Sequence, residues 1–256
     1  MKKTILAIAA VLCVTALPSI SQAQDNPLSF NASLTSDYRY RGISQTRLKP
    51  ALQGGVDYAL PAGFYIGAWG STIKWIKDAG GDAQVELDLY GGYKGEIVKD
   101  LTLDVGLLQY VYPGAKTAAF DALYKGPNTT EVYGALTYGP ATAKASVALT
   151  NLFGNYDFAG NNKSNGSVYL EVAAGFEVGG GVTLTPHLGY QKVRNIANAS
   201  YTDFSLIASK DFSGFLVSGG IVGTDANKTF YVPGPAANST KFLGKTSGVV
   251  SVKYTF

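Results

Sequence analysis

Cysteine, methionine and histidine are almost missing from this chain, which has one residue of each. The cysteine, Cys13, lies in an apolar N-terminal run, and Leu12 precedes it where lipid acylation would need a small residue. The rest of the chain can therefore form neither a disulfide nor a thiolate metal site. This composition excludes a disulfide-stabilised scaffold, and we predict no lipid anchor.

Long hydrophobic runs are missing as well, apart from residues 5–17. That run follows Lys2 and Lys3, is too short to span a bilayer and precedes Ser21-Gln22-Ala23, a small-x-small cleavage site. We therefore predict a signal peptide over residues 1–23 and one exported domain over residues 24–256. No later run approaches the roughly 18 apolar residues of a membrane helix. A membrane location would have to use strands.

A strong charge of one sign is also missing. Without Lys2 and Lys3 the formal charge falls from +3 to +1. A balance this close to zero gives no reason to expect nucleic acid or another polyanion as a partner. The high counts of Gly, 31, and Tyr, 17, suit a β-protein better than a helical one.

What is present is strict alternation of apolar and polar residues, the pattern of extended strands. In residues 28–41, Leu28, Phe30 and Leu34 share one face, while Asp37 and Arg39 share the other. Such a run is long for a soluble strand of about 5–6 residues but suits a membrane strand. Twelve strands are predicted in this way: residues 28–41, 52–60, 64–75, 84–94, 101–112, 131–138, 141–150, 167–178, 182–194, 201–210, 215–224 and 246–256.

The connections between these strands alternate in length. Those after even-numbered strands are turn-like, as at Pro61-Ala62-Gly63 and Gly139-Pro140, whereas those after odd-numbered strands are longer and more polar. Short periplasmic turns and longer extracellular loops are the layout of bacterial outer-membrane barrels. The predicted fold class is therefore all-β: a transmembrane antiparallel β-barrel of about 12 strands in the outer membrane of a Gram-negative bacterium.

The last strand is expected to close the barrel by pairing with the first. Its alternation places Val250, Val252, Tyr254 and Phe256 toward lipid, and Ser251 and Lys253 toward the barrel interior, the lumen. Other aromatic residues near strand ends are expected in interfacial girdles: Tyr38, Tyr40, Tyr110, Tyr112 and Tyr138. Resemblance to outer-membrane proteins implies that the final Phe is read by the barrel-assembly machinery.

Charged residues on the polar faces are expected in the lumen, because Lys or Arg facing lipid near the midplane costs about 2–4 kcal/mol. Two interpretations stay open. Arg39 and Arg41 could face carboxylates such as Asp57, Glu86 and Asp88 across a constriction, or the charges could pair and plug a narrow interior. The predicted pore-lining residues are Asp37, Arg39, Arg41, Asp57, Glu86, Asp88, Glu131, Glu171 and Lys253.

Catalytic and metal-binding constellations are not apparent. His187 is the only histidine, and no serine spacing suggests a hydrolase beside it. Glu86 and Asp88 share a face but lack a third ligand nearby. The Gly clusters precede no helix pattern, so they are not phosphate loops. We predict no enzyme, no metal and no cofactor.

Several stretches of the first half resemble a known family. Residues 33–46, SLTSDYRYRGISQT, followed by PALQGG at 50–55, resemble the opening signature of the TorF family of proteobacterial porins. GFYIGAWGS at 63–71, ELDLYGGY at 86–93 and YVYPG at 110–114 extend the likeness. The resemblance implies an outer-membrane barrel for passive transport. Residues 42–45 are expected to fold inward as the first outside loop.

The sequence supports two functions. The first is a narrow channel for passive diffusion of small hydrophilic solutes. The second is a closed structural or surface-interaction barrel that binds a partner through its long loops, chiefly residues 113–130 and 225–245. Outer-membrane lipid, small polar solutes and the assembly machinery are the expected partners.

Overall fold

The structure is a computed structural model that describes residues 26–256. The predicted signal peptide lies outside these residues. The wall strands are β1 (Leu28–Thr35), β4 (Ala51–Ala59), β5 (Phe64–Thr72), β6 (Val85–Val98), β7 (Leu101–Val111), β8 (Thr129–Tyr138), β9 (Ala141–Ala148), β12 (Val168–Ala174), β13 (Phe176–Glu177), β14 (Val182–Lys192), β15 (Tyr201–Phe212), β16 (Phe215–Thr224) and β17 (Ser247–Thr255).

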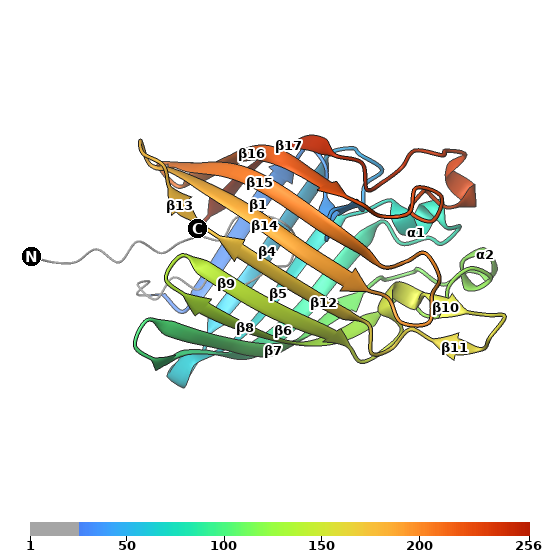
Figure 1. Cartoon of the computed structure of the whole chain (residues 1–256), viewed down its shortest axis with the longest axis horizontal. Coiled ribbons are helices and arrows are strands. Elements are labelled where there is room, and N and C mark those ends of the chain that lie inside the picture. The colour runs from blue at the N-terminus through green and yellow to red at the C-terminus, as the bar shows by residue number, and fades with distance from the viewer. Residues whose placement is uncertain (1–25) are drawn as a thin grey trace, which may run out of the picture.

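These strands form one closed antiparallel barrel (Figure 1). Each strand pairs with the next along the chain, and β1 pairs with β17, with Thr35 opposite Ser251 and Asn31 opposite Thr255. The short strand β13 continues β12 along the same partner, β14, so the wall has twelve strand positions. The predicted twelve-stranded barrel and the pairing of its first and last strands are confirmed.

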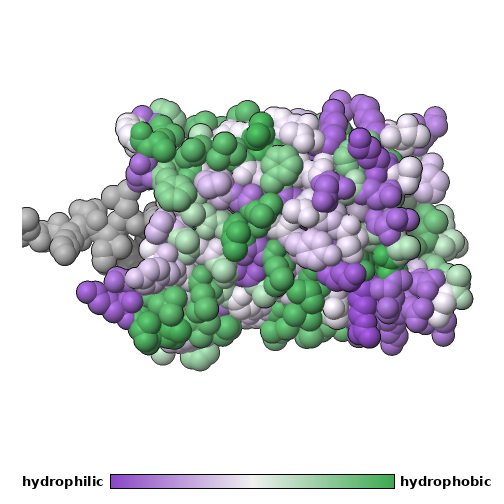
Figure 2. Space-filling model, viewed as in Figure 1, coloured by the Kyte–Doolittle hydropathy of each residue, from purple (hydrophilic) through white to green (hydrophobic). Residues whose placement is uncertain are grey.

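The wall is apolar outside and polar inside. Outward side chains such as Leu52 are widely exposed, here to 64%, whereas the inward neighbour Gln53 is buried. Figure 2 shows hydrophobic residues over the strand region and hydrophilic residues gathered toward the end that carries the long loops. On β17, Val250 is exposed and Ser251 is buried, and Phe256, which directly follows this strand, is exposed, as the alternation predicts.

The two ends of the barrel differ. One end has short turns: η1 (Pro61–Gly63), Lys99–Asp100, Gly139–Pro140, residues 178–181 and Ser213–Gly214. The other has the long loops, with α1 (Trp75–Asp78), α2 (Ala118–Asp121), η2 (Leu152–Gly154), η3 (Pro235–Ala237) and the hairpin β10 (Tyr156–Asp157) and β11 (Asn162–Lys163) (Figure 1). No helix in residues 26–256 is long and apolar enough to span a membrane.

The first strand is shorter than the alternation indicates. It ends at Thr35, not Arg41, and the chain leaves the wall at Ser36, whose backbone N–H donates to the Val250 carbonyl over 2.8 Å. The pattern continues past Thr35 because residues 37–44 form a second hairpin, β2 (Arg39–Tyr40) and β3 (Ile43–Ser44), inside the barrel. The wall strand β1 and the strands of this hairpin share the same two-residue period of apolar and polar residues. The pattern therefore did not reveal where β1 ends.

Inward tyrosines lie flat on the wall over glycines of neighbouring strands. Tyr169 on β12 covers Gly189 on β14, where an added Cβ would overlap the Tyr169 hydroxyl. Tyr65 covers Gly92 in the same manner. A glycine is required at such positions because any side chain would displace the ring that covers it.

We predict that Gly189→Ala lowers the stability of the folded barrel by about 1–3 kcal/mol, the usual cost of overpacking. The urea midpoint of refolding in detergent micelles measures this change. Gly219→Ala is the matched control, because its Cβ would meet nothing nearer than 3.7 Å. Equal midpoints for the two variants would contradict the proposed packing of Tyr169 on Gly189.

Candidate functional site

The first long loop enters the lumen and fills the end that carries the long loops, which we call the outer end. We call residues 36–50 the inward loop. The hairpin β2–β3 reverses at Arg41 and Gly42, with φ of 45° and 78°, the left-handed pair of a tight two-residue hairpin turn. Every residue from Asp37 to Ser44 is buried. The inward fold expected for residues 42–45 is confirmed, and Gly42 is the sequence signal for its turn.

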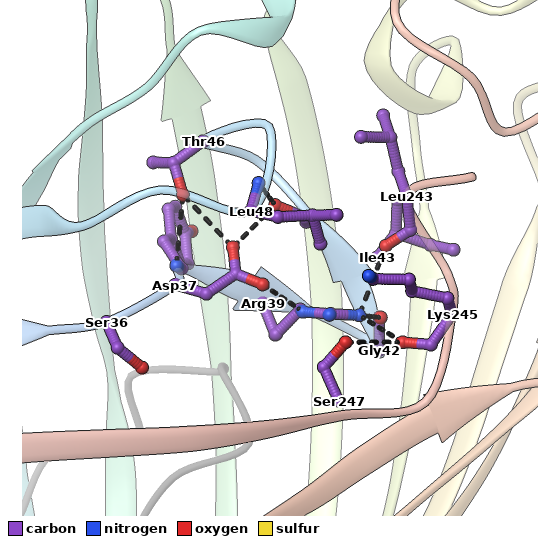
Figure 3. Close-up of polar contacts among 12 residues, drawn as sticks. Ser36, Asp37, Arg39, Gly42, Ile43, Thr46, Leu48, Leu243, Lys245 and Ser247 are labelled. Carbon is purple, nitrogen blue, oxygen red and sulfur yellow. Dashed lines mark hydrogen bonds and ion pairs between the residues drawn. The ribbon is translucent and has the colours of Figure 1, made fainter. Parts of the chain in front are cut away.

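Arg39 ties the inward loop to the last long loop. Its Nε donates to the Asp37 carboxylate, and its Nη1 donates to the carbonyls of Gly42, Leu243 and Lys245 over 2.8–3.2 Å (Figure 3). The Asp37 carboxylate also accepts from the hydroxyls of Ser44 and Thr46. Loop ends that are about 200 residues apart in the chain are thus joined through one buried guanidinium.

Arg41 at the hairpin tip reaches across the lumen. Its guanidinium donates to Glu131 on β8 over 2.7 Å and to Gln191 on β14 over 2.6 Å. It also stacks on the rings of Tyr40 and Tyr169, at 4.7 and 4.2 Å from their centroids. With only 1% of its surface exposed, this is a desolvated ion pair with a cation–π sandwich.

An aromatic cluster covers the inward loop from outside. Trp75 of α1 packs edge-on against Tyr112, and its ring also meets Phe120, Tyr124 and Phe153 from two further loops. Burial raises the pKa of the Tyr124 phenol, so its hydroxyl stays protonated at neutral pH. The long loops therefore pack on one another and close the outer mouth.

Some inward side chains far from the long loops are more exposed than those close to the loops. Arg41 and Glu131, near the outer mouth, are at most 2% exposed, whereas Asp57, further down β4, is 8% exposed. Ser29 and Lys253, near the end with short turns, are partly exposed. Ser29 and Lys253 are thus more exposed than the inward side chains at the loop end, whereas Tyr65, also toward the short turns, is buried.

All nine predicted pore-lining residues lie inside the barrel or in its inward loop. Seven are buried, namely Asp37, Arg39, Arg41, Asp57, Glu86, Asp88 and Glu131, and two, Glu171 and Lys253, are partly exposed. Neither arginine pairs with the carboxylates named in the first of the two open interpretations. Arg39 pairs with Asp37 and Arg41 with Glu131, not with Asp57, Glu86 or Asp88. The turn of the inward loop, which the strand pattern hid, redirects both guanidinium groups.

Tyrosine hydroxyls donate hydrogen bonds to carboxylates on β4, β6 and β7. We call the part of the barrel from β4 to β7 the β4–β7 wall. Glu86 accepts from Tyr112 over 2.6 Å and also from Tyr38, Asp57 accepts from Tyr90 over 2.6 Å, and Asp104 accepts from Tyr65 over 2.6 Å. The sequence pattern did not identify these tyrosines as partners. Tyr38, Tyr40, Tyr110 and Tyr112, predicted for the girdles, are buried inside, whereas Tyr138 is 66% exposed. Tyr90 follows Glu86 and Asp88 at two-residue intervals on the same strand, so the alternation could have placed its side chain inside the barrel.

The buried charges of the lumen are mostly acidic. The acidic side chains are Asp37, Asp57, Glu86, Asp88, Asp104, Glu131 and Asp203, and the basic ones are Arg39, Arg41 and Lys144. Among the partly exposed side chains, Glu171 adds to this excess, whereas Lys94 and Lys253 reduce it without removing it.

His187 lies between two carboxylates. Its Nε2 is 3.1 Å from Glu171 and its Nδ1 is 3.6 Å from Asp203, which also accepts from the Tyr169 hydroxyl. The two carboxylates lie beside different nitrogens of the imidazole ring. They therefore cannot bind one metal ion together with the imidazole. Within residues 26–256, no group of three or more potential ligands is placed to hold a metal.

Comparison with known proteins identifies the family. The model of the family named Gcw_chp, described as a bacterial protein of unknown function, matches residues 21–256. The chain belongs to the Gcw_chp family. A search of curated proteins finds no match. The resemblance to the TorF family stays a prediction.

Solved porins share the fold of this Gcw_chp chain. The KdgM porin in complex with disordered oligogalacturonate aligns with a TM-score of 0.51 at 8% identity, covering 90% of this chain and 98% of that one. A second KdgM porin structure gives 0.50 at 7% identity with the same coverage, and the NanC porin gives 0.49 at 9%, again covering 90% and 98%. At these identities the likeness to the two KdgM porin structures shows the barrel fold alone.

We predict that Arg41→Ala loosens the inward loop. Removing the guanidinium leaves the Glu131 carboxylate buried without its partner, which costs about 3–5 kcal/mol. Trypsin added to the folded protein should then cut after Arg39, a bond that is buried in the wild type. Lys49→Ala, in the exposed part of the same loop, is the control and should leave Arg39 protected. Protection of Arg39 in both variants would contradict the role of the ion pair.

Proposed function

We propose that this protein is an outer-membrane channel for passive diffusion of small hydrophilic solutes. The observation that carries the proposal is the distribution of polarity: the barrel exposes an apolar band and encloses its charges. A soluble barrel does the opposite, because its exterior must meet water. Charged side chains inside a closed antiparallel barrel are typical of outer-membrane channels.

The mechanism needs no covalent step. Solutes small enough to pass between the wall and the inward loop would diffuse along the polar lumen. Because the outer end is sealed by Arg39, Arg41 and the aromatic cluster, passage requires the inward loop to move. The channel is therefore narrow, and its conducting state is less populated than its closed state.

The ligand in the KdgM porin complex is not one that we propose for this chain. That porin was solved with oligogalacturonate, an acidic saccharide. The lumen here has an excess of buried carboxylates, and like charges within a narrow channel repel an anionic solute. We propose neutral or positively charged small solutes instead.

Burial of the outer lumen also favours a second candidate, a closed barrel that presents its long loops to a partner. Arg41 and Glu86, at the outer end, are at most 2% exposed. In that case the charges serve only to hold the loops in place.

Planar-bilayer recording separates the two candidates. A channel gives discrete conductance steps, and Arg41→Ala should raise the fraction of time spent open relative to the wild type, with Lys49→Ala unchanged. Folding of each variant is checked by its heat-dependent mobility in detergent gels. Silent bilayers from correctly folded wild type and Arg41→Ala would favour the closed barrel.

We infer further that the final residue assists assembly. Phe256 donates its N–H to the Phe30 carbonyl over 2.9 Å and accepts from the Phe30 N–H over 2.8 Å, and the two rings stack at 5.8 Å. It thus ends the seam that closes the barrel, and as a C-terminal aromatic it suits recognition by the barrel-assembly machinery.

Deleting Phe256 should lower the amount of folded barrel in outer membranes severalfold, because both seam bonds and the aromatic end are lost. Phe256→Trp keeps the aromatic ring and the backbone bonds, so it should assemble normally. Immunoblots of unheated membrane samples measure the folded fraction. Normal assembly of the deletion variant would refute this role.

A further inference from the structure

The β4–β7 wall carries a row of carboxylates that form no ion pair within residues 26–256. Among the buried lumen carboxylates, Asp37 and Glu131 are paired with arginines, and Asp203 lies beside His187. The other four form no ion pair with any described residue: Asp57, Glu86, Asp88 and Asp104. They lie on β4, β6 and β7, three of the four consecutive wall strands β4, β5, β6 and β7. The lumen carboxylates are therefore divided between a group held in ion pairs and a wall whose carboxylates form none, with Lys94 opposite Asp104 and Lys253 near Asp57.

These carboxylates are spaced along the barrel axis. Glu86 lies near the outer mouth, opposite Ser71 near the end of β5, and Asp88 follows one inward position further along β6. Asp57 lies opposite Gly67, the β5 partner of Tyr90, and Asp104 lies opposite Lys94, toward the short-turn end. A row of negative charge thus runs from the inward loop toward the short-turn end.

Hydroxyls stabilise three of these carboxylates without neutralising them. Tyrosine hydroxyls donate to Glu86, Asp57 and Asp104. A neutral donor satisfies an oxygen lone pair but leaves the net charge in place, so each such group still attracts cations.

Asp88 differs from the other three. It is 4% exposed, faces the lumen from β6, and its Oδ1 has no hydrogen-bond partner among the described residues. A buried carboxylate oxygen without a donor is costly, and a cation or ammonium group in the lumen would relieve that cost. Arg39 and Arg41 are bound in their own ion pairs, and the Lys144 ammonium lies over the Tyr133 ring at 4.6 Å. Lys94 and Lys253 lie further from Asp88, Lys94 opposite Asp104 and Lys253 near Asp57.

We propose that the channel selects cations and positively charged small solutes over anions, and that Asp88 is the main residue that sets this selectivity. This inference rests on the proposed function, because it requires a conducting lumen. The carboxylates of the β4–β7 wall provide the path, and Asp88 lies where that path meets the inward loop.

The test is the zero-current potential of the purified protein in a bilayer with unequal KCl on the two sides. The wild type should show a potential of the sign set by K⁺ permeation. Asp88→Asn should lower the K⁺/Cl⁻ permeability ratio by about 25-fold, because one unit charge about 4 Å away in water changes the permeation of K⁺ and of Cl⁻ in opposite directions by about fivefold each. Asp88→Glu keeps the charge and should keep the preference.

Asp82→Asn is the matched control, because Asp82 is exposed in a long loop and forms no ion pair with a described residue. Its permeability ratio should equal that of the wild type. Conductance without cation preference, or equal loss of preference in Asp82→Asn and Asp88→Asn, would overturn the selectivity proposal and leave the channel proposal intact. Silent bilayers from folded protein would overturn both.

Discussion

The structure depends on one constraint, that every backbone N–H and carbonyl of a strand in lipid must find a partner within the sheet. The chain meets it by pairing β17 with β1, down to the two bonds between Phe256 and Phe30. Once the seam is closed, each strand has one face outside and one inside, and the alternation of residues decides what each face carries. The apolar band and the charged lumen both follow from this closure.

Closure in turn creates a problem of space, because an interior of twelve strands is wider than side chains alone fill. Here the inward loop takes up the outer part of that space. Its hairpin places Arg41 between Glu131 and Gln191, and its base is joined through Arg39 to the carbonyls of Leu243 and Lys245. Below the loop, tyrosines lie flat over glycines. The barrel is thus asymmetric along its axis, because the inward loop fills only the end that carries the long loops.

The same arrangement divides the lumen charges. Both arginines belong to the inward loop and are used to hold it, so they compensate carboxylates that lie close to it. The β4–β7 wall keeps its carboxylates with tyrosine partners instead. One consequence is that moving the loop would take positive charge away from the lumen, so that an opened channel would be more acidic than the closed one. Gating by the loop and preference for cations would then share a cause.

Much of this could be predicted from the sequence, since the two-residue period fixes which side chains face lipid and the alternating connection lengths fix which end is which. The alternation alone predicted the twelve strands, the pairing of the first with the last, and the inward position of Asp57, Glu86 and Asp88. The end of β1 at Thr35, the partners of Arg39 and Arg41, and the inward tyrosines at the loop end were decided only by tertiary structure. A strand and an inserted hairpin have the same period, and which charges meet depends on how the hairpin turns inside the closed wall.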